Sequence, residues 1–251
     1  MNRRDFNKYI NGTAFKVGEM SQDNKIHLDF SLLLNYFEAL GKSYNLKFFI
    51  DKNDITVFEN LFNYYLKDEE YCTRKNIDPN KGLLLVGGNG VGKSTIIKMF
   101  AEFFISGKPK VYSMCDLSEK VSIDGIAALD IINYQRDFIL DDVGSEMQSV
   151  YYGTRNEVFS SILMNFEQKN FPAYTPDENN FVTKLSSSDI SSTRTNPKIH
   201  ARIFASTNFT LQEFEDRYGK RVYSRMAEYF NIINFPTTID KRIARANIIR
   251  D

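Results

Sequence analysis

The chain has 251 residues, of which 42% are hydrophobic and 25% charged, and its 32 Lys and Arg balance 32 Asp and Glu. This length fits one α/β domain with an appendage or two small domains, and the balanced charge gives no support for broad, non-specific binding to nucleic acid. Two cysteines, Cys72 and Cys115, are too few for a disulfide framework or a cysteine metal site. No apolar run reaches signal-peptide or membrane-span length, so we expect a cytoplasmic protein with no membrane partner.

Residues 1–52 are expected to form an N-terminal extension that precedes a main domain of residues 53–251. The apolar residues of Asp29–Leu40 recur with helical spacing and are followed by Gly41, which predicts a helix that ends there. Leu46–Ile50 is a candidate for a short strand. Two interpretations of the extension stay open: it packs onto the main domain, or its aromatic helix docks a partner.

An amphipathic helix is predicted over Asn53–Leu66, because a capping residue precedes an apolar stripe. We interpret it as part of the core. A run of acids, Asp68 to Glu70, and a turn at Asp78 to Asn80 separate this helix from the next element.

The stretch Gly82–Phe100 carries the most specific motif of the chain. Four apolar residues predict a buried strand, the pattern GxxxxGKS follows, and helical spacing resumes after it. In this order, backbone N–H groups and a helix N-terminus face a bound phosphate. Lys93 should reach the β and γ phosphates of ATP, and the Ser94 hydroxyl should ligate Mg²⁺. The whole predicted cradle comprises Gly87, Gly88, Asn89, Gly90, Val91, Gly92, Lys93, Ser94 and Thr95.

Two adjacent acids end a second apolar run, in the segment DFILDDVGSE of residues 137–146. Asp141 lies where the end of a strand would hold Mg²⁺. Asp142 should point to the other side of the strand and polarise the attacking water. Many exposed strand ends carry two acids, so the functional interpretation depends on the phosphate-binding motif upstream. The segments between the two motifs predict a helix over Ser94–Phe104, a strand over Lys110–Cys115 and a helix over Leu117–Asn133 that Gly125 interrupts.

A polar insertion separates the next helix, predicted over Tyr151–Gln168, from the next strand. Residues 171–200 are rich in Ser, Thr, Asn and Pro, and we interpret them as a long mobile loop. The strand Ala201–Thr207 then ends at Asn208, whose side chain could contact the γ-phosphate or the attacking water. The alternative is an asparagine that serves only the turn.

A basic pair lies in the segment after a short helix predicted over Leu211–Tyr218. Arg221 and Arg225 are four residues apart and therefore share one helical face, which is usually a solvated surface. An apolar strand candidate follows at residues 232–235, and the end of the chain forms a modest basic patch: Lys241, Arg242, Arg245 and Arg250.

Taken together, residues 80–235 resemble AAA+ ATPases, specifically the DnaC/DnaI type of replicative helicase loader and its relative, the IstB transposition helper. GGNGVGKST resembles the Walker A loop, and FILDDVGSE resembles a Walker B strand with the continuation DD-x-G-x-E. IFASTN resembles sensor 1, and GKRVYSRM resembles the arginine-bearing box of the loaders and of the initiator DnaA.

The resemblance implies self-association, with ATP and Mg²⁺ bound between neighbouring subunits. One subunit would supply the phosphate-binding and acidic side chains, which are Lys93, Ser94, Asp141 and Asp142. Asn208 would position the water, and an arginine of the next subunit would reach the γ-phosphate. Arg225 is the first choice for that arginine and Arg221 the second. The N-terminal part would contact a hexameric replicative helicase, and the assembled ATPase would contact single-stranded DNA.

The implied fold is a three-layer α/β P-loop NTPase with a mainly parallel sheet. By the same resemblance, the Walker B and sensor 1 strands should flank the phosphate-loop strand. The sequence departs from the family in three ways: it has no N-terminal cysteine cluster, the insertion at 171–200 is long, and little or no C-terminal lid is expected.

Three functional hypotheses remain. The first is an ATPase that loads or remodels a replicative helicase on single-stranded DNA. The second is a transposition helper that acts on duplex DNA. The third is an ATP-gated binding module with little turnover.

Overall fold

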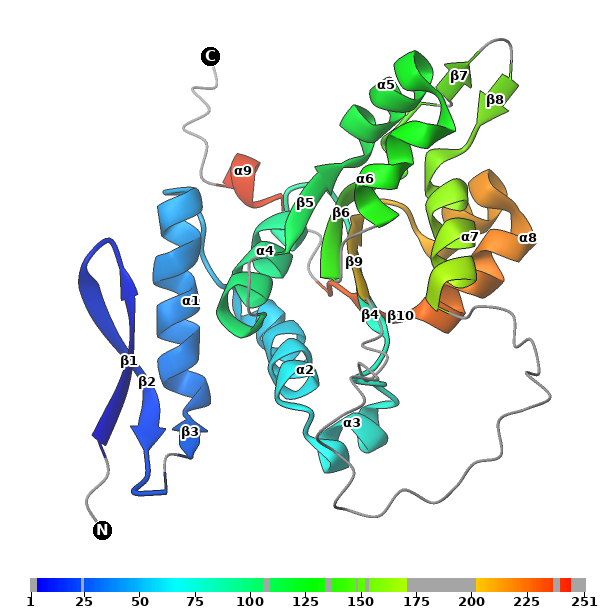
Figure 1. Ribbon diagram of the computed structural model, residues 1–251. Helices are drawn as coiled ribbons and strands as arrows, with labels where there is room; N and C mark the ends of the chain where they lie inside the picture. The colour runs from blue at the N-terminus through cyan, green and yellow to red at the C-terminus, as the bar shows by residue number, and fades with distance from the viewer. Residues whose placement is uncertain are drawn as a thin grey trace, which may run out of the picture.

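Five parallel strands form the central sheet of the computed structural model (Figure 1). The structure describes residues 4–23, 25–105, 109–133, 137–147, 149–151, 154–170, 202–236 and 240–244. The strands are β4 (Gly82–Val86), β5 (Lys110–Ser113), β6 (Asp137–Val143), β9 (Arg202–Thr207) and β10 (Phe230–Asn234). All residues of β4 are buried, as expected for an apolar strand inside a parallel sheet covered on both faces.

The order of the strands is β10-β4-β9-β6-β5, which corrects one prediction. The strand predicted to carry sensor 1, β9, does pair with β4, but the other neighbour of β4 is β10. The strand that resembles Walker B, β6, pairs with β9 and β5 instead. The end of β9 therefore lies between the phosphate loop and the acids. Local sequence predicts strands but not their order, because the order depends on how the crossover helices pack.

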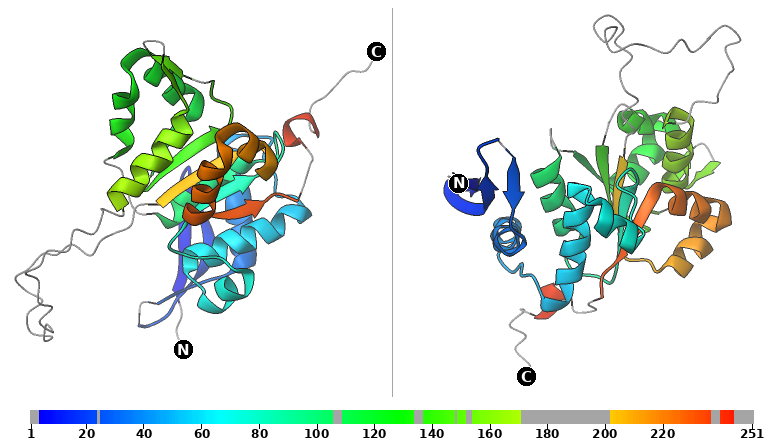
Figure 2. Two further views of the ribbon diagram at one scale, coloured as in Figure 1. Left: turned by 90° about the vertical axis from the view of Figure 1, so that its right-hand side faces the viewer. Right: turned by 90° about the horizontal axis from the view of Figure 1, so that it is seen from below.

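Helices cover both faces of the sheet and give the predicted three-layer α/β fold (Figures 1 and 2). One face packs against α1, α2 and α4, where the Phe37 and Phe100 rings stack at 4.4 Å. The other face packs against α5, α7 and α8. The helices are α1 (Phe30–Tyr44), α2 (Ile55–Leu66), α3 (Glu69–Lys75), α4 (Lys93–Phe104), α5 (Met114–Asp124), α6 (Asp130–Asn133), α7 (Val158–Asn170), α8 (Leu211–Tyr229) and α9 (Lys241–Ala244), with 3₁₀ turns at Lys52–Asp54 and Ile126–Leu129.

The N-terminal part contains a small antiparallel sheet that the sequence analysis missed. Its strands are β1 (Arg4–Ile10), β2 (Thr13–Met20) and β3 (Ile26–Leu28). β1 alternates between exposed and half-buried residues, and only a few of them are apolar, so its pattern is weak. This sheet lies against α1, on the side of α1 that faces away from the central sheet (Figures 1 and 2). Since α1 shares a core with α2 and α4, the extension packs onto the main domain; docking of a partner stays a prediction.

The prediction of a strand over Leu46–Ile50 is wrong, as is the helix end at Gly41. α1 continues to Tyr44, and residues 45–50 form an irregular segment. Gly41 is buried within the helix because Phe48 packs directly on it: a Cβ there would lie 2.1 Å from the Phe48 ring. Gly41 thus permits a close contact instead of ending the helix.

Other elements differ in their bounds. Acids 68–70, interpreted as a separator, begin α3, where Asp68 caps the first turn. α7 begins at Val158 and not at Tyr151 as predicted. The residues before it form a hairpin of β7 (Ser149–Tyr151) and β8 (Thr154–Asn156). Helix α8 joins the two predicted segments across Gly219, which has non-helical angles, and Gly125 interrupts its helix as predicted. The insertion at 171–200, Arg245 and Arg250 lie outside the described residues. No helix in the described part of the chain is both long and apolar enough to cross a bilayer.

Candidate nucleotide-binding site

The phosphate-binding motif lies between β4 and α4, as predicted. Gly92 immediately precedes the first residue of α4, so the loop leads directly into a helix N-terminus. Gly90 has a φ of +71°, and a Cβ there would lie 1.8 Å from an oxygen of Asp240. A side chain at position 90 would therefore meet both backbone strain and a clash with the segment before α9.

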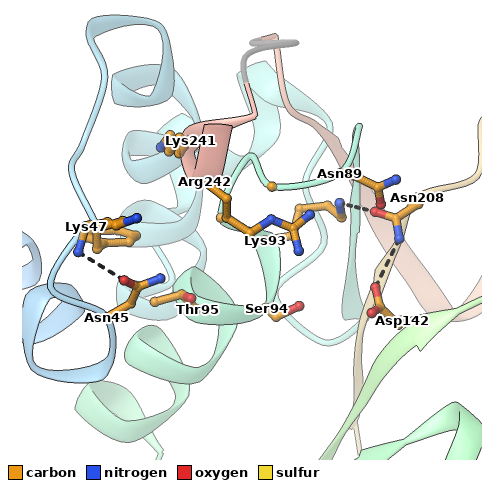
Figure 3. A pocket seen from close by; sticks show the side chains of 13 residues that line it. Asn45, Lys47, Asn89, Lys93, Ser94, Thr95, Asp142, Asn208, Lys241 and Arg242 are labelled. Carbon is orange, nitrogen blue, oxygen red and sulfur yellow. Dashed lines mark hydrogen bonds between the residues drawn. The ribbon is translucent and has the colours of Figure 1, made fainter. Parts of the chain in front are cut away.

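Residues of the predicted cradle have different positions. Asn89, Gly90, Gly92, Lys93, Ser94 and Thr95 line a pocket at the carboxyl end of the sheet (Figure 3). Gly87 and Gly88 contribute carbonyl groups that accept hydrogen bonds from Lys93, while the Val91 side chain is buried in the core.

The Lys93 ammonium group lies inside this pocket and donates three hydrogen bonds. Its Nζ atom is 2.8 Å from each of the carbonyl oxygens of Gly87 and Gly88 and 2.7 Å from Oδ1 of Asn208. Lys93 is only 5% exposed, and this burial lowers its pKa to about 8. An ammonium group that is poorly solvated and has only neutral acceptors is well placed to bind an anion.

Asn208 connects the phosphate loop to the acids. Its Oδ1 accepts from Lys93, and its Nδ2 donates to Oδ1 of Asp142 at 3.2 Å (Figure 3). This connection follows from the strand order, because β9 lies between β4 and β6. Three residues that are distant in the sequence, Lys93, Asp142 and Asn208, thus meet at one point.

The side chains of Asp141 and Asp142 point in different directions because of a bulge in β6, and not because side chains alternate along a regular strand. Between the pairs Leu140–Ala205 and Val143–Thr207, β6 has one residue more than β9, which is a β-bulge. Asp142 lies in this bulge with a φ of +61°, a left-handed conformation that Asp and Asn tolerate better than most residues. The simple prediction that Asp142 points to the opposite side of a regular strand is therefore corrected. The bulge directs the Asp142 side chain into the pocket.

Asp141 is held by hydrogen bonds on both carboxylate oxygens. Oδ1 accepts from the Ser206 hydroxyl at 2.7 Å, and Oδ2 accepts from the Lys98 ammonium group, also at 2.7 Å. Burial alone would raise the pKa of Asp141, but hydrogen bonds from Lys98, Ser94 and Ser206 outweigh it and hold the pKa below its ordinary value. Asp141 is therefore ionised at neutral pH.

The pair Ser94 and Asp141 fits a magnesium ion. The Ser94 hydroxyl lies close enough to Asp141 to help lower the pKa of that carboxyl, and both side chains offer the oxygen ligands that Mg²⁺ prefers. The described residues contain no cluster of three or more His, Cys, Asp or Glu side chains that could hold a metal by themselves.

A second wall of the pocket was missed by the sequence analysis. It consists of Asn45, Lys47 and Phe48 from the segment after α1 and of Lys241 and Arg242 from α9 (Figure 3). The basic patch at the end of the chain was the only sequence signal for the latter two. Arg242 extends toward Lys93 and contributes to lowering its pKa.

A buried ion pair fixes this second wall. The Lys241 ammonium group contacts the Asp54 carboxylate, and both side chains are almost fully buried. Lys241 also donates to the carbonyl oxygen of Phe49, and its backbone N–H donates to the carbonyl oxygen of Gly90 at 3.1 Å. α9 is therefore attached both to the start of α2 and to the phosphate loop.

The arginines Arg221 and Arg225 do not approach this pocket. They lie on α8, which packs on the sheet face opposite α4 and contributes no residue to the pocket lining within the described chain. Arg225 forms an ion pair with Glu228 at 2.7 Å, and Arg221 is exposed. If either arginine acts on a phosphate, that phosphate belongs to another subunit.

The third acid of DDVGSE, Glu146, joins the end of β6 to α8. Glu146 is 2% exposed, and burial raises its pKa although Tyr218 and the Gly144 N–H donate hydrogen bonds to it. Arg217 donates to the carbonyl oxygens of Gly144 and Glu146. This acid therefore has a structural role between the site and α8.

Comparisons with known proteins give only distant likenesses. No protein family and no curated protein matches the sequence. Among solved structures, one described as a DNA replication initiation factor has 12% identity and a TM-score of 0.44, with 75% of this chain and 47% of that chain covered. AMPPCP-bound DnaA from Aquifex aeolicus has 13% identity and a TM-score of 0.45, with 81% and 53% covered. The chain thus spans about half the length of each, and likenesses of this degree assign no function to it.

Proposed function

We propose that this protein is an ATPase of the AAA+ class that loads or remodels a replicative DNA helicase on single-stranded DNA. The observation that carries the nucleotide chemistry is the meeting of Lys93, Asn208 and Asp142 beside the phosphate loop. The AAA+ assignment and the helicase partner rest on the order of the sequence motifs, from Walker A to the arginine-bearing box.

Each side chain has a role in this proposal. Lys93 and the N–H groups of the loop bind the β and γ phosphates, replacing the acceptors that Lys93 now contacts. Ser94 and Asp141 hold Mg²⁺, which would neutralise charge on the phosphates. Asp142 accepts a proton from the attacking water, and Asn208 orients that water or the γ-phosphate. The second wall of the pocket, which includes Asn45 and Phe48, would contact the base and ribose.

An assembled form is part of the proposal, because the arginines of α8 lie away from the pocket of their own chain. An arginine of a neighbouring subunit would stabilise the charge that develops on the γ-phosphate. Turnover stimulated by single-stranded DNA would support the loader. ATP-dependent assembly on duplex DNA would support a transposition helper, and tight ATP-dependent capture of a partner without turnover would support a binding module.

Substitution of Lys93 by alanine tests the nucleotide site. We expect the affinity for ATP to fall about 30- to 160-fold, because a charge-assisted contact to two phosphates contributes about 2–3 kcal/mol. Binding is measured by titration calorimetry with a non-hydrolysable ATP analogue and Mg²⁺. Lys42→Ala, which removes an exposed lysine paired with Glu38 on α1, is the matched control and should bind like the wild type. Unchanged affinity in Lys93→Ala would contradict the assignment.

The pH dependence of binding tests the same lysine differently. Burial lowers the pKa of Lys93 to about 8, so the free protein loses this positive charge as the pH rises through 8. A phosphate stabilises the charged form, so binding takes up a proton above pH 8 and becomes weaker. We expect affinity about tenfold lower at pH 9 than at pH 7. Lys93→Arg stays charged throughout, and a pH effect of equal size in that variant would exclude Lys93 as its source.

A further inference from the structure

Lys98 is a charged residue at the site that belongs to none of the four sequence motifs. It follows Ser94 by four residues on α4, so the two side chains lie on the same helical face. Its ammonium group is 2.7 Å from Oδ2 of Asp141, and the Lys98 and Asp141 side chains are 37% and 17% exposed. A close, partly exposed ion pair thus involves the very carboxylate that we assign to Mg²⁺.

The remaining oxygen of Asp141 is also engaged, because Oδ1 accepts the Ser206 hydroxyl. A magnesium ion that binds Asp141 must therefore share an oxygen with one of these donors or displace it. Displacing Lys98 relieves repulsion between two cations, whereas displacing a neutral hydroxyl does not. Lys98 also has space to withdraw, since it lines a second cavity with Tyr44, Glu102 and Val111, away from the nucleotide pocket.

We propose that Lys98 competes with Mg²⁺ for Asp141 and so sets the magnesium concentration that nucleotide binding requires. This inference rests on the proposed nucleotide site, and it gives Lys98 an indirect role, exerted through Asp141. The ammonium group is a compact point charge with three donors, which occupies the carboxylate and keeps it ionised. Magnesium binding is then opposed by the charge of Lys98 or must displace its ammonium group, and removal of that charge makes the binding of Mg²⁺ more favourable.

The test is a magnesium titration of nucleotide binding. A trace of fluorescent mant-ATP is held with the protein, and binding is followed by fluorescence anisotropy as Mg²⁺ is increased. We expect Lys98→Gln to be half-saturated at about fivefold lower Mg²⁺ than the wild type, a modest factor because the ion pair is partly exposed and screened. Mg²⁺ also binds the nucleotide in solution, but this affects all variants equally. A difference between variants in the Mg²⁺ concentration at half-saturation therefore arises from the protein.

Two control variants distinguish loss of the Lys98 charge from a general effect of substitution on the fold. Lys98→Arg keeps a positive charge beside Asp141 and should stay within about twofold of the wild type. Lys42→Gln removes an exposed lysine that pairs with Glu38 on α1, away from the site, and should show no shift. Thermal unfolding of each variant verifies that it is folded, and Lys98→Met provides a second neutral side chain of similar length.

The outcomes are distinct. If both neutral variants require the same Mg²⁺ as the wild type, or more, Lys98 does not compete with the metal and the inference is overturned. A requirement for more Mg²⁺ would mean instead that Lys98 holds Asp141 in its binding position. If the wild type binds no mant-ATP at any Mg²⁺ concentration, the proposed function itself fails, and the inference fails with it.

Discussion

Substitution of Arg225 by alanine is expected to lower the ATP turnover number about a thousandfold while ATP affinity stays within about threefold of the wild type. The reason is geometric: Arg225 lies on α8, remote from the pocket of its own chain, so it can act only on a phosphate bound by a neighbour. An arginine that stabilises the transferring phosphoryl group contributes a factor of 10³ or more, or about 4 kcal/mol of barrier.

The measurement is turnover at saturating Mg²⁺ and ATP with single-stranded DNA present, alongside analogue binding. Lys220→Ala, which removes an exposed cation from the same helix, should behave like the wild type. Arg221→Ala decides between the two candidate arginines, since the loss should follow only one of them. Turnover within twofold of the wild type in both arginine variants would exclude this helix as the source of the catalytic arginine.

Substitution of Asp142 by asparagine is expected to give a protein that binds ATP but turns it over about a thousandfold more slowly. The lost group is the carboxylate that, in the proposed function, would accept the proton of the attacking water. The substitution should remove the negative charge without disturbing the local structure. Asparagine also tolerates the left-handed backbone at φ +61° of residue 142, and its side chain retains an oxygen that can accept the hydrogen bond from the Asn208 amide. The fold and the hydrogen bond to Asn208 should therefore persist.

Turnover and analogue binding are again measured together, with thermal unfolding to verify the fold. Asp116→Asn, in the exposed first turn of α5, is the matched control for loss of one negative charge. Wild-type turnover in Asp142→Asn would require a different general base. Mixing this variant with Arg225→Ala adds a test of assembly: a shared site combines an intact Asp142 of one subunit with an intact Arg225 of the other, so the mixture should regain part of the activity that each variant lacks.

The bulge in β6 illustrates why the site needed the tertiary structure. The adjacent acids were visible in DFILDDVGSE, and alternation along a regular strand already separated them. In the structure the separation arises from one extra residue in β6 opposite β9, and Ser206 accepts the Asp142 N–H that the bulge frees. A bulge depends on the register between two strands, and 65 residues separate Asp141 from Ser206 along the chain.

The second wall of the pocket likewise could not be predicted from the sequence alone. Leu46–Ile50 was interpreted as a possible strand, and Lys241 and Arg242 were noted only as part of a basic end. Their common position depends on the buried ion pair between Lys241 and Asp54, which are 187 residues apart. No local pattern encodes such a contact, because it forms only when α9 returns to the start of α2.

The sequence by itself determined the phosphate-binding loop, the two acids, the asparagine at the end of β9 and most helices and strands of the main domain. These are local properties, since hydrophobic periodicity and motif spacing act over a few turns of chain. Only the tertiary structure decided that β9 lies between β4 and β6, that Asp142 enters the pocket through a bulge, that Lys98 pairs with Asp141 and that α9 forms a wall. The physical reason is that these features consist of contacts between distant segments, which the packing of the helices on the sheet selects.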